Sequence, residues 1–276
     1  MALYINTNVA SEGAQKNLLA NQAKLMTSFT RLSSGLRINT AKDDAAGLAI
    51  SESLKSQIRS FNVAERNASD GISMAQTAEG ALGEVHNILG RMRELAVQAS
   101  NGNLLESDRE FLQTEFSSLQ AEITRIQGSA KFNGTALVGT TANTITLQVG
   151  LDDADSDQID VVLGGVSLSD ITASAATLAG STEDSALDAL GTIDDAIGSV
   201  STARATFGAA MNRLEVAQSS IQTMRLNLSA ANSRIRDVDV ASETANLSRN
   251  QVLTQAGISV LAQANQLPQL AFGLLG

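Results

Sequence analysis

The sequence lacks cysteine and tryptophan, and it contains one proline, one tyrosine and one histidine among 276 residues. Without cysteine there is no disulfide framework, no thiol nucleophile and no thiolate metal site. The single proline, Pro268, permits very long helices, because proline in a helix interior removes a backbone hydrogen bond. No stretch reaches about 18 continuous apolar residues, and the first residues contain neither a basic start nor an apolar run. We therefore expect no membrane insertion and no cleaved signal peptide.

Acidic residues are concentrated in the middle of the chain. The whole sequence has 29 acidic and 19 basic residues. Between Phe132 and Ala203 there is no lysine or arginine, and the eleven acidic residues of this window are Asp152, Asp153, Asp155, Asp157, Asp160, Asp170, Glu183, Asp184, Asp188, Asp194 and Asp195. The rest of the chain is almost neutral. We expect the window to face solvent, and its charge argues against a nucleic acid partner, which requires a basic surface.

Two long stretches have apolar residues at every seventh position. The first row is Leu54, Phe61, Ala68, Ala75, Leu82, Leu89 and Ala96, and a second row beside it is Ala78, Val85, Met92 and Ala99. The downstream row is Ile193, Val200, Phe207, Leu214, Ile221, Leu228 and Ile235, followed at three residues by Ala196, Ala203, Ala210, Ala217, Met224, Ala231 and Val238. This heptad spacing predicts two long helices, and the small residues allow close approach.

A shorter helix is predicted between them. Ser107 and Glu110 fit a capping box at its start, and its apolar positions are Leu112, Phe116, Leu119, Ile123 and Ile126. The residues Asn101-Gly102-Asn103 favour a turn that reverses the chain before this helix. The three helices can therefore form one antiparallel bundle.

The middle of the chain has the period of strands. Residues 132–134 (Phe-Asn-Gly) interrupt the helical pattern, and residues 144–149 and 159–163 alternate apolar and polar side chains. Gly164-Gly165 resembles a hairpin turn leading to a further strand at Val166 and Leu168. Residues 172–185 have the composition of a loop. The segment is too short for a large additional domain.

Both ends of the chain are also predicted helices. Leucines at every seventh position are Leu18, Leu25 and Leu32 near the start, and the matching row near the end is Leu253, Val260, Leu267 and Leu274. No charged residue follows Arg249. Packing one such helix on the other does not obviously offset the cost of ordering both backbones. We therefore expect the uncharged tail to pack against other copies of the chain, where unpaired charge would be costly.

Candidate chemical sites have simpler structural explanations. Residues 37–47 include Arg37, Lys42, Asp43 and Asp44, which suit a charged linker, a helix start and ion pairs between subunits. A calcium loop beginning at Asp153 would need glycine at its sixth position and glutamate at its twelfth, and the sequence has neither there. The only histidine, His86, lies within a heptad helix. We predict no catalytic residue, cofactor or metal, and no enzyme activity.

Four segments resemble the bacterial flagellins: residues 32–51 (LSSGLRINTAKDDAAGLAIS), 132–134, 203–215 (ARATFGAAMNRLE) and 245–269 (ANLSRNQVLTQAGISVLAQANQLPQ). The resemblance implies a structural subunit that polymerises into the flagellar filament for motility, in a short form without large outer domains. The alternative within the same superfamily is a hook–filament junction protein. An enzyme inserted in the variable region is disfavoured by the absence of cysteine and the single histidine. A membrane-active amphipathic protein is disfavoured by the tail, which is rich in amides and has no basic face.

The expected fold is mainly α. A long antiparallel coiled coil and helical bundle would be formed by the N- and C-terminal regions, with a small β-hairpin region in the middle. Residues 1–44 and 237–276 would form the terminal coiled-coil core with its linker. Residues 45–131 and 184–236 would form the helical rod, and residues 132–183 the outward-facing hairpin and loop region.

The resemblance also implies partners. Arg91, Leu95 and Glu115 would contact an adjacent subunit and the vertebrate innate-immune flagellin receptor. The leucine and valine rows at the two ends would line the polymer core. Besides copies of itself, the chain would meet an export chaperone, the filament cap and hook-junction proteins. It would be exported through the flagellar type III channel without a cleaved signal peptide and would act outside the cell.

Overall fold

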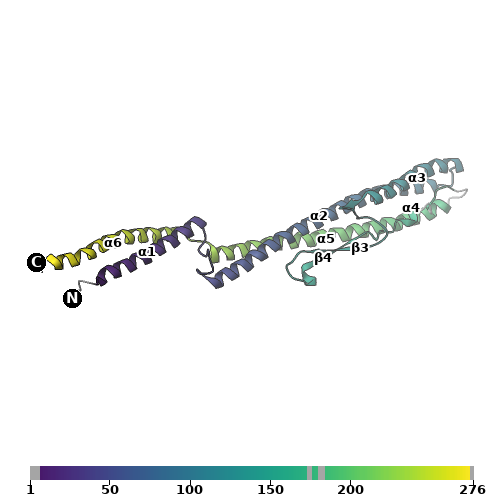
Figure 1. Cartoon of the computed structure of the whole chain (residues 1–276). Helices are drawn as coiled ribbons and strands as arrows, with labels where there is room; N and C mark the ends of the chain where they lie inside the picture. Colours follow the sequence, from purple (N-terminus) through teal and green to yellow (C-terminus); the bar gives the residue numbers. More distant parts are fainter. Residues whose placement is uncertain (1–6, 173–175, 180–183, 274–276) are drawn as a thin grey trace. The chain divides into compact units, whose positions relative to one another are not determined.

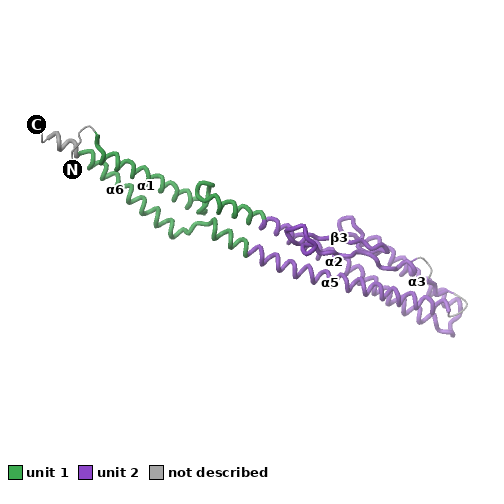
Figure 2. Tube along the Cα trace, turned by 90° about the horizontal axis from the view of Figure 1, so that it is seen from below, with its two compact units in different colours: residues 1–56, 227–276 green, residues 57–226 purple. Residues whose placement is uncertain are grey.

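The computed structural model describes residues 7–172, 176–179 and 184–273, with side chains up to residue 266. Its helices are α1 (Val9–Ser34), α2 (Ala45–Ala99), α3 (Glu106–Ser129), α4 (Ser169–Thr172), α5 (Asp184–Arg236) and α6 (Val240–Gly273) (Figure 1). The chain divides into two compact units, Met1–Ser56 with Asn227–Gly276, and Gln57–Leu226 (Figure 2). The expectation of a mainly α fold built from the two ends of the chain is confirmed.

In the first unit, α1 packs along α6. Asn8 caps the start of α1 by accepting a hydrogen bond from the backbone N–H of Ser11 at 3.0 Å. The helix ends at Gly35, whose φ of 71° is the left-handed conformation that glycine adopts at little cost. The terminal pair is therefore made of two long helices from opposite ends of the sequence.

The segments that follow α1 and precede α6 are joined by a short antiparallel bridge between Leu36 and Asp237. The backbone N–H of Arg37 donates to the carbonyl of Arg236 at 2.7 Å, and that of Val238 donates to the carbonyl of Gly35 at 3.0 Å. The linker is thus fixed by backbone hydrogen bonds. Its charged sequence, which suggested ion pairs, gives no sign of this pairing.

The start of α2 is capped as its sequence predicts. The Asp44 carboxylate accepts a hydrogen bond from the backbone N–H of Gly47 at 2.8 Å. Gly47 is buried, and a Cβ at this position would collide with the side chains of Asp44 and Ile38. The helix start therefore depends on a glycine that allows Ile38, 2% exposed, to close over it.

In the second unit, α2, α3 and α5 enclose a continuous apolar core. The heptad pattern is confirmed for most of its positions in this unit, which are buried: Phe61, Ala68, Ala75, Ala78, Leu82, Val85, Leu89, Met92, Ala96 and Ala99 on α2, Phe116, Ile123 and Ile126 on α3, and Ile193, Ala196, Val200, Phe207, Ala210, Leu214 and Ile221 on α5. The predicted positions Leu112, Leu119, Ala203 and Ala217 are half-buried. Met224 departs from the pattern. It is 50% exposed and lines a groove beside the connection between β3 and β4.

Ion pairs join the helices of this bundle along their exposed edges. Between α2 and α5 they link Arg93 to Asp194 (2.7 Å), Glu79 to Arg204 (2.6 Å) and Glu65 to Arg225 (2.7 Å). Exposed pairs of this kind contribute little to stability individually. They do confirm that α2 and α5 lie side by side and run in opposite directions.

The predicted turn at residues 101–103 is confirmed, but the predicted capping box is wrong. Helix α3 already begins at Glu106, so Ser107 lies inside its first turn. The position before the helix is occupied by Leu105, whose backbone N–H is bound by the Asp108 carboxylate at 3.2 Å. An acidic side chain in the first turn takes over the capping role that the sequence pattern assigned to a serine hydroxyl.

Along the chain, two antiparallel two-stranded ribbons follow α3 and precede α5. Strands β1 (Lys131–Phe132) and β2 (Thr135–Ala136) flank Asn133 and Gly134, whose φ values of 47° and 82° suit a tight turn. Strands β3 (Asn143–Gln148) and β4 (Gln158–Leu163) form the second ribbon, with Thr144 opposite Val162. The helix break at residues 132–134 and the strands at 144–148 and 159–163 are confirmed.

The predicted hairpin turn at Gly164-Gly165 is wrong. The β3–β4 hairpin is closed by residues 149–157, which include the short 3-10 helix η1 (Asp155–Asp157). Gly164 instead donates its N–H to the carbonyl of Leu137 at 3.1 Å, and Val166 donates to Gly139 at 3.0 Å. Both glycines have positive φ, because the chain crosses close to the backbone there. Val166 and Leu168 are buried but belong to no strand.

The predicted loop at 172–185 is partly confirmed. Residues 173–175 and 180–183 lie outside the described residues, and 176–179 have no regular structure. These four residues are held to α3 by Gln113, whose side-chain oxygen accepts the N–H of Leu178, and by Gln120, which donates to the carbonyl of Ala176 at 3.1 Å. The loop prediction extended too far at its end, because α5 begins at Asp184.

The acidic window is exposed as expected. Its described aspartates all have exposed side chains except Asp157, which is half-buried, and Glu183 lies outside the described residues. Asp157 is partly covered because its carboxylate accepts the backbone N–H of Asp152 at 2.8 Å and thereby shapes the hairpin connection. A search of the described residues found no helix long and apolar enough to cross a membrane.

Candidate functional site

The face that α6 turns toward α1 combines small and polar residues with two leucines. The less exposed positions of α6 recur at alternating steps of four and three: Glu243, Leu247, Asn250, Thr254, Gly257, Leu261 and Ala264. On α1 the corresponding positions include Ser11, Ala14, Leu18, Asn21, Leu25, Ser28 and Leu32. Polar contacts connect the two faces. Asn8 donates to the carbonyl of Ala264 at 2.8 Å, and Ser11 donates to the side chain of Asn265 at 2.6 Å.

Large apolar side chains of the terminal pair lie on its outside. On α6, Val252 is 64% exposed, Ile258 55% and Val260 55%. On α1, Leu19 is 60%, Met26 68% and Phe29 64% exposed. The pair therefore carries large apolar side chains on its exterior as well as leucines between its two helices, and the exterior ones are left uncovered.

The two predicted leucine rows therefore lie on different faces. Leu18, Leu25 and Leu32 are half-buried between α1 and α6. Leu253 is 44% exposed and lines the edge of the groove between α1 and α6, whereas Val260, 55% exposed, does not line that groove. The side chains of Leu267 and Leu274 lie outside the described residues. Equal spacing identified residues that share a face on each helix, but it could not identify which face the partner helix covers.

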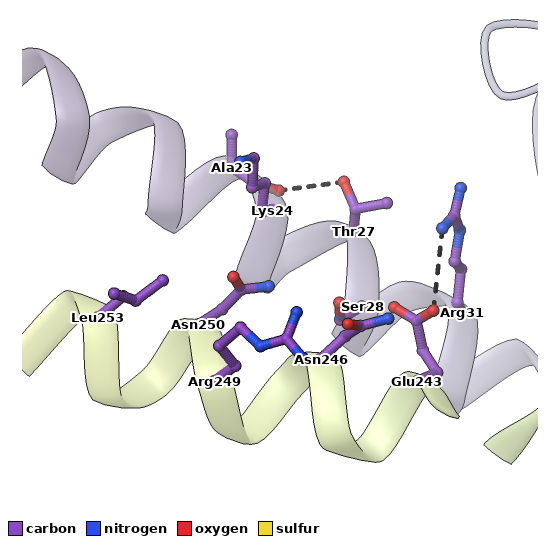
Figure 3. Close-up of a pocket in the computed structure, with 10 residues that line it drawn as sticks. All are labelled: Ala23, Lys24, Thr27, Ser28, Arg31, Glu243, Asn246, Arg249, Asn250 and Leu253. Atoms are coloured by element: carbon purple, nitrogen blue, oxygen red, sulfur yellow. Dashed lines mark hydrogen bonds and ion pairs between the residues drawn. The ribbon is translucent and has the colours of Figure 1, made fainter. Parts of the chain in front are cut away.

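An open groove of about 470 Å³ runs between α1 and α6 (Figure 3). Its basic side chains are Lys24 and Arg31 from α1 and Arg249 from α6, and its acid is Glu243. Arg31 pairs with Glu243 and also with Asp43, at 3.9 Å in both cases. The sequence prediction did not identify this groove. Its signal would have been the excess of basic over acidic residues on the two terminal helices.

The charged linker acts structurally. The pKa of Asp43 lies below its ordinary value, mainly because the backbone N–H of Thr40 donates to its carboxylate, with further help from the Thr40 hydroxyl. Arg37 donates to the carbonyl of Ile235 at 2.7 Å. These side chains are engaged in backbone contacts that shape the linker, and among the described residues no cluster of three or more potential metal ligands was found.

Arg91 and Glu115 come together on the bundle surface, whereas Leu95 does not join them there. The Arg91 Nε donates to the Glu115 carboxylate at 2.9 Å, which links α2 to α3, and Arg91 also binds Glu94. These hydrogen bonds raise the pKa of Arg91, with the one to Glu115 as the largest cause. Leu95 is 1% exposed in the core of the same bundle. The heptad pattern placed it beside the core row, and three-helix packing covers it.

Comparisons with known proteins agree along the whole chain. Models of the bacterial flagellin N-terminal and C-terminal helical regions match residues 5–142 and 190–275. A flagellin of Halalkalibacterium halodurans is 45% identical over 273 residues, which is 99% of this chain and 100% of that protein. A flagellin of Bacillus subtilis is 41% identical over 304 residues, again 99% and 100%. A putative flagellar hook-associated protein from Vibrio parahaemolyticus shares the fold, with a TM-score of 0.61 at 16% identity over 71% of this chain and 100% of that one.

Proposed function

Because the chain belongs to the bacterial flagellin family and is a structural subunit of the flagellar filament, we propose that its α1–α6 pair forms the filament core by packing against neighbouring copies. Residues 1–44 and 237–276 would supply this core. Residues 45–131 and 184–236 would form the surrounding rod, and residues 132–183 would face outward. We assign the chain no catalytic role, in keeping with a family of structural proteins.

The observation that supports this assignment is the exposed apolar exterior of the terminal pair. Leu253 and Val260 are 44% and 55% exposed on a helix that has no charge after Arg249. Burying such side chains against other copies stabilises the polymer by roughly 25 cal/mol per Å² of apolar surface. A charge on the same flank would have to be buried without a partner. Leu267 and Leu274 continue this row in the sequence and are proposed to act in the same way.

The test compares two identical substitutions at similarly exposed valines. Val260→Asp changes the proposed core, and Val162→Asp changes β4 of the outward hairpin, where Val162 is 48% exposed. We expect Val260→Asp to abolish filament formation, as seen by electron microscopy and sedimentation, while the thermal unfolding of the bundle is unchanged. Val162→Asp should assemble normally. Normal filaments from Val260→Asp would refute the proposed role of this flank.

The surface formed by Arg91 and Glu115 is proposed to contact an adjacent subunit and, in the monomer, the innate-immune flagellin receptor. Leu95 would support this surface from beneath. A charge-swapped Arg91→Glu, Glu115→Arg variant should keep the ion pair between α2 and α3 but lose the exposed pair with Glu94, which contributes little to stability. Its bundle should stay folded, and it should lose receptor activation in reporter cells. The matched control swaps Arg125 and Glu122, an exposed pair on α3. Receptor activation equal to that of the unmodified protein would remove Arg91 and Glu115 from the proposed contact.

We further propose export through the flagellar type III channel, without a cleaved signal peptide, and encounters with an export chaperone, the filament cap and hook-junction proteins. Flagellin homologues form the extracellular filament, which requires some route out of the cell. Secretion that continued without the flagellar export apparatus but stopped without the Sec pathway would overturn this proposal. The hook–filament junction alternative is less well supported, since the relatives at 41% to 45% identity over the whole chain are named flagellins.

A further inference from the structure

The charges on the terminal helix pair do not balance. The four bases and two acids of α1 and α6 are Lys16, Lys24, Arg31, Arg249, Glu12 and Glu243. Arg31 already pairs with Glu243. Lys24 and Arg249 face the same groove from opposite helices, and neither forms an ion pair with any described residue (Figure 3). The groove therefore presents two uncompensated positive charges.

Assembly makes this excess costly. If neighbouring copies cover the outside of the terminal pair, the groove between α1 and α6 is removed from water. A base in such a place needs a hydrogen-bonded acid, because an uncompensated buried charge is strongly destabilising. Asn246 and Asn250 also line the groove. Their amides are neutral, so they can form hydrogen bonds to a carboxylate that enters the groove but cannot balance the positive charge.

The terminal unit has few acids left to supply that charge. The acids with described partners are Asp43 (bound to Thr40 and Arg31), Asp44 (bound to Gly47), Glu52 (bound to Arg236), Asp239 (bound to Ala241) and Glu243 (bound to Arg31). Glu12 and Asp237 remain. Glu12 is exposed in the first turn of α1, on the helix pair itself, whereas Asp237 lies in the bridged linker.

We infer that the Glu12 carboxylate of a second copy enters the groove and pairs with Lys24 and Arg249. This inference rests on the proposed assembly of the terminal pair and specifies one of its contacts. Glu12 and Lys24 are separated by 12 positions of α1, which at 1.5 Å per residue is roughly 18 Å along the helix axis. Two contacting copies that run in the same direction are therefore displaced by about that distance.

Charge reversal with rescue tests the contact in the full chain. Glu12→Lys and Arg249→Glu, each alone, should raise the critical concentration for filament assembly about tenfold, because each places like charges together. The double variant Glu12→Lys, Arg249→Glu should restore it to within about twofold of the unmodified protein. Far-ultraviolet circular dichroism and thermal unfolding of the monomers confirm that none of the variants has lost its fold.

Two control variants separate the alternatives. Lys16 is one turn after Glu12 on the same helix, so rescue of Glu12→Lys by Lys16→Glu instead of Arg249→Glu would show a local pair and overturn the inference. Rescue of Asp237→Lys by Arg249→Glu would show that the acid entering the groove is Asp237, and would also overturn the inference about Glu12. If the unmodified chain forms no filament, the proposed function itself fails. If it does and the Glu12 double variant is not rescued, only this inference fails.

Discussion

The two units use the same heptad spacing with opposite results. In the bundle, Leu82, Val85 and Leu89 are 0% exposed. In α1 of the terminal pair the one buried residue is Ser28, and the larger side chains of Leu19, Met26 and Phe29 point outward. The difference follows from the number of neighbours. Each helix of a three-helix bundle is covered on two sides, whereas each helix of an isolated pair is covered on one.

This contrast explains why we expect the bundle to fold within one chain, whereas the terminal pair should require packing against other copies of the chain. Between α1 and α6, small and polar residues alternate with the half-buried leucines Leu18, Leu25, Leu32, Leu247 and Leu261. The small and polar members gain little from burial, since such side chains have few apolar atoms. Their hydrogen bonds contribute about 1 kcal/mol each at most sites. The outer apolar stripes hold further stabilisation, which only other copies can realise.

The largest effect is expected at the bundle core. Leu95→Asp places a charge at a position that is 1% exposed, so it should reduce the free energy of unfolding of the bundle by about 3–5 kcal/mol. Val97→Asp, at a neighbouring position that is 50% exposed, should change it by less than about 0.5 kcal/mol. Urea unfolding followed by circular dichroism measures both. Similar values for the two variants would contradict the burial of Leu95.

A smaller loss is expected at the turn between α2 and α3. The Arg109 side chain is 3% exposed and donates to the carbonyls of Ala99 at 3.0 Å and Asn101 at 3.4 Å, where α2 ends. Arg109→Ala removes the donor to the Ala99 carbonyl, while the Asn101 carbonyl keeps the N–H of Leu104 at 3.2 Å, and should cost about 1–3 kcal/mol of stability. Arg125→Ala, on the exposed face of the same helix, is the control. An unfolding midpoint that shifted equally in both variants would exclude a specific capping role for Arg109.

Two glycine substitutions compare the units directly. A Cβ at Gly71 would collide with the side chain of Leu147 and lie 3.1 Å from that of Leu214, so Gly71→Ala should destabilise the bundle by about 1–3 kcal/mol. A Cβ at Gly257 would meet only Leu18, at an ordinary 3.4 Å. Gly257→Ala should therefore favour helix α6 by up to about 1 kcal/mol. Hydrogen exchange of α6 amides should slow in this variant, and faster exchange would mean that the pair requires the glycine.

The smallest expected effect is on how the stability of the bundle depends on pH at Asp194. The pKa of Asp194 lies below its ordinary value of 3.8, because Arg93 donates a hydrogen bond to its carboxylate. Because the pKa of Asp194 is lower in the folded state, its contribution to folding stability is fully present above the pKa of the unfolded state. This contribution is lost as the pH falls through the pKa of the folded state. Asp194→Asn should therefore lower the bundle's melting temperature slightly at neutral pH and show a shallower decline below about pH 4. Asp195→Asn is the control, and parallel pH profiles for Asp194→Asn and the unmodified protein would contradict the assignment.

The sequence predicted the features that depend on the spacing of apolar residues. It failed for features whose structure is decided by contacts between distant parts of the chain. The core positions of α2 and α5 followed from steps of seven, and the break at residues 132–134 followed from Asn-Gly. The turn at Gly164-Gly165 was misplaced because two glycines with positive φ also suit a close backbone crossing, which no local pattern distinguishes from a hairpin. The resemblance implied a surface contact for Leu95, whereas the period had only placed it beside the core row, and in the bundle it is 1% exposed.

At the candidate assembly surface the same limit applied. The rows beginning at Leu18 and Leu253 remain predictions as a polymer core, and the burial of each row depends on how α1 and α6 pair. The groove at Lys24 and Arg249 combines residues that are 225 positions apart (249 − 24). No local window contains both, so only a count of charges over the two helices could have suggested the site.

The bridge between Leu36 and Asp237 means that the terminal pair can form only when both ends of the chain are present. It joins the two sides of a loop of about 200 residues. A polypeptide that stops anywhere before α6 contains α1 without the helix that α1 packs on, so translation fragments cannot present both outer stripes. The first helix to be synthesised is therefore among the last to be paired, and a subunit that lacks α6 also lacks one of the two outer apolar stripes.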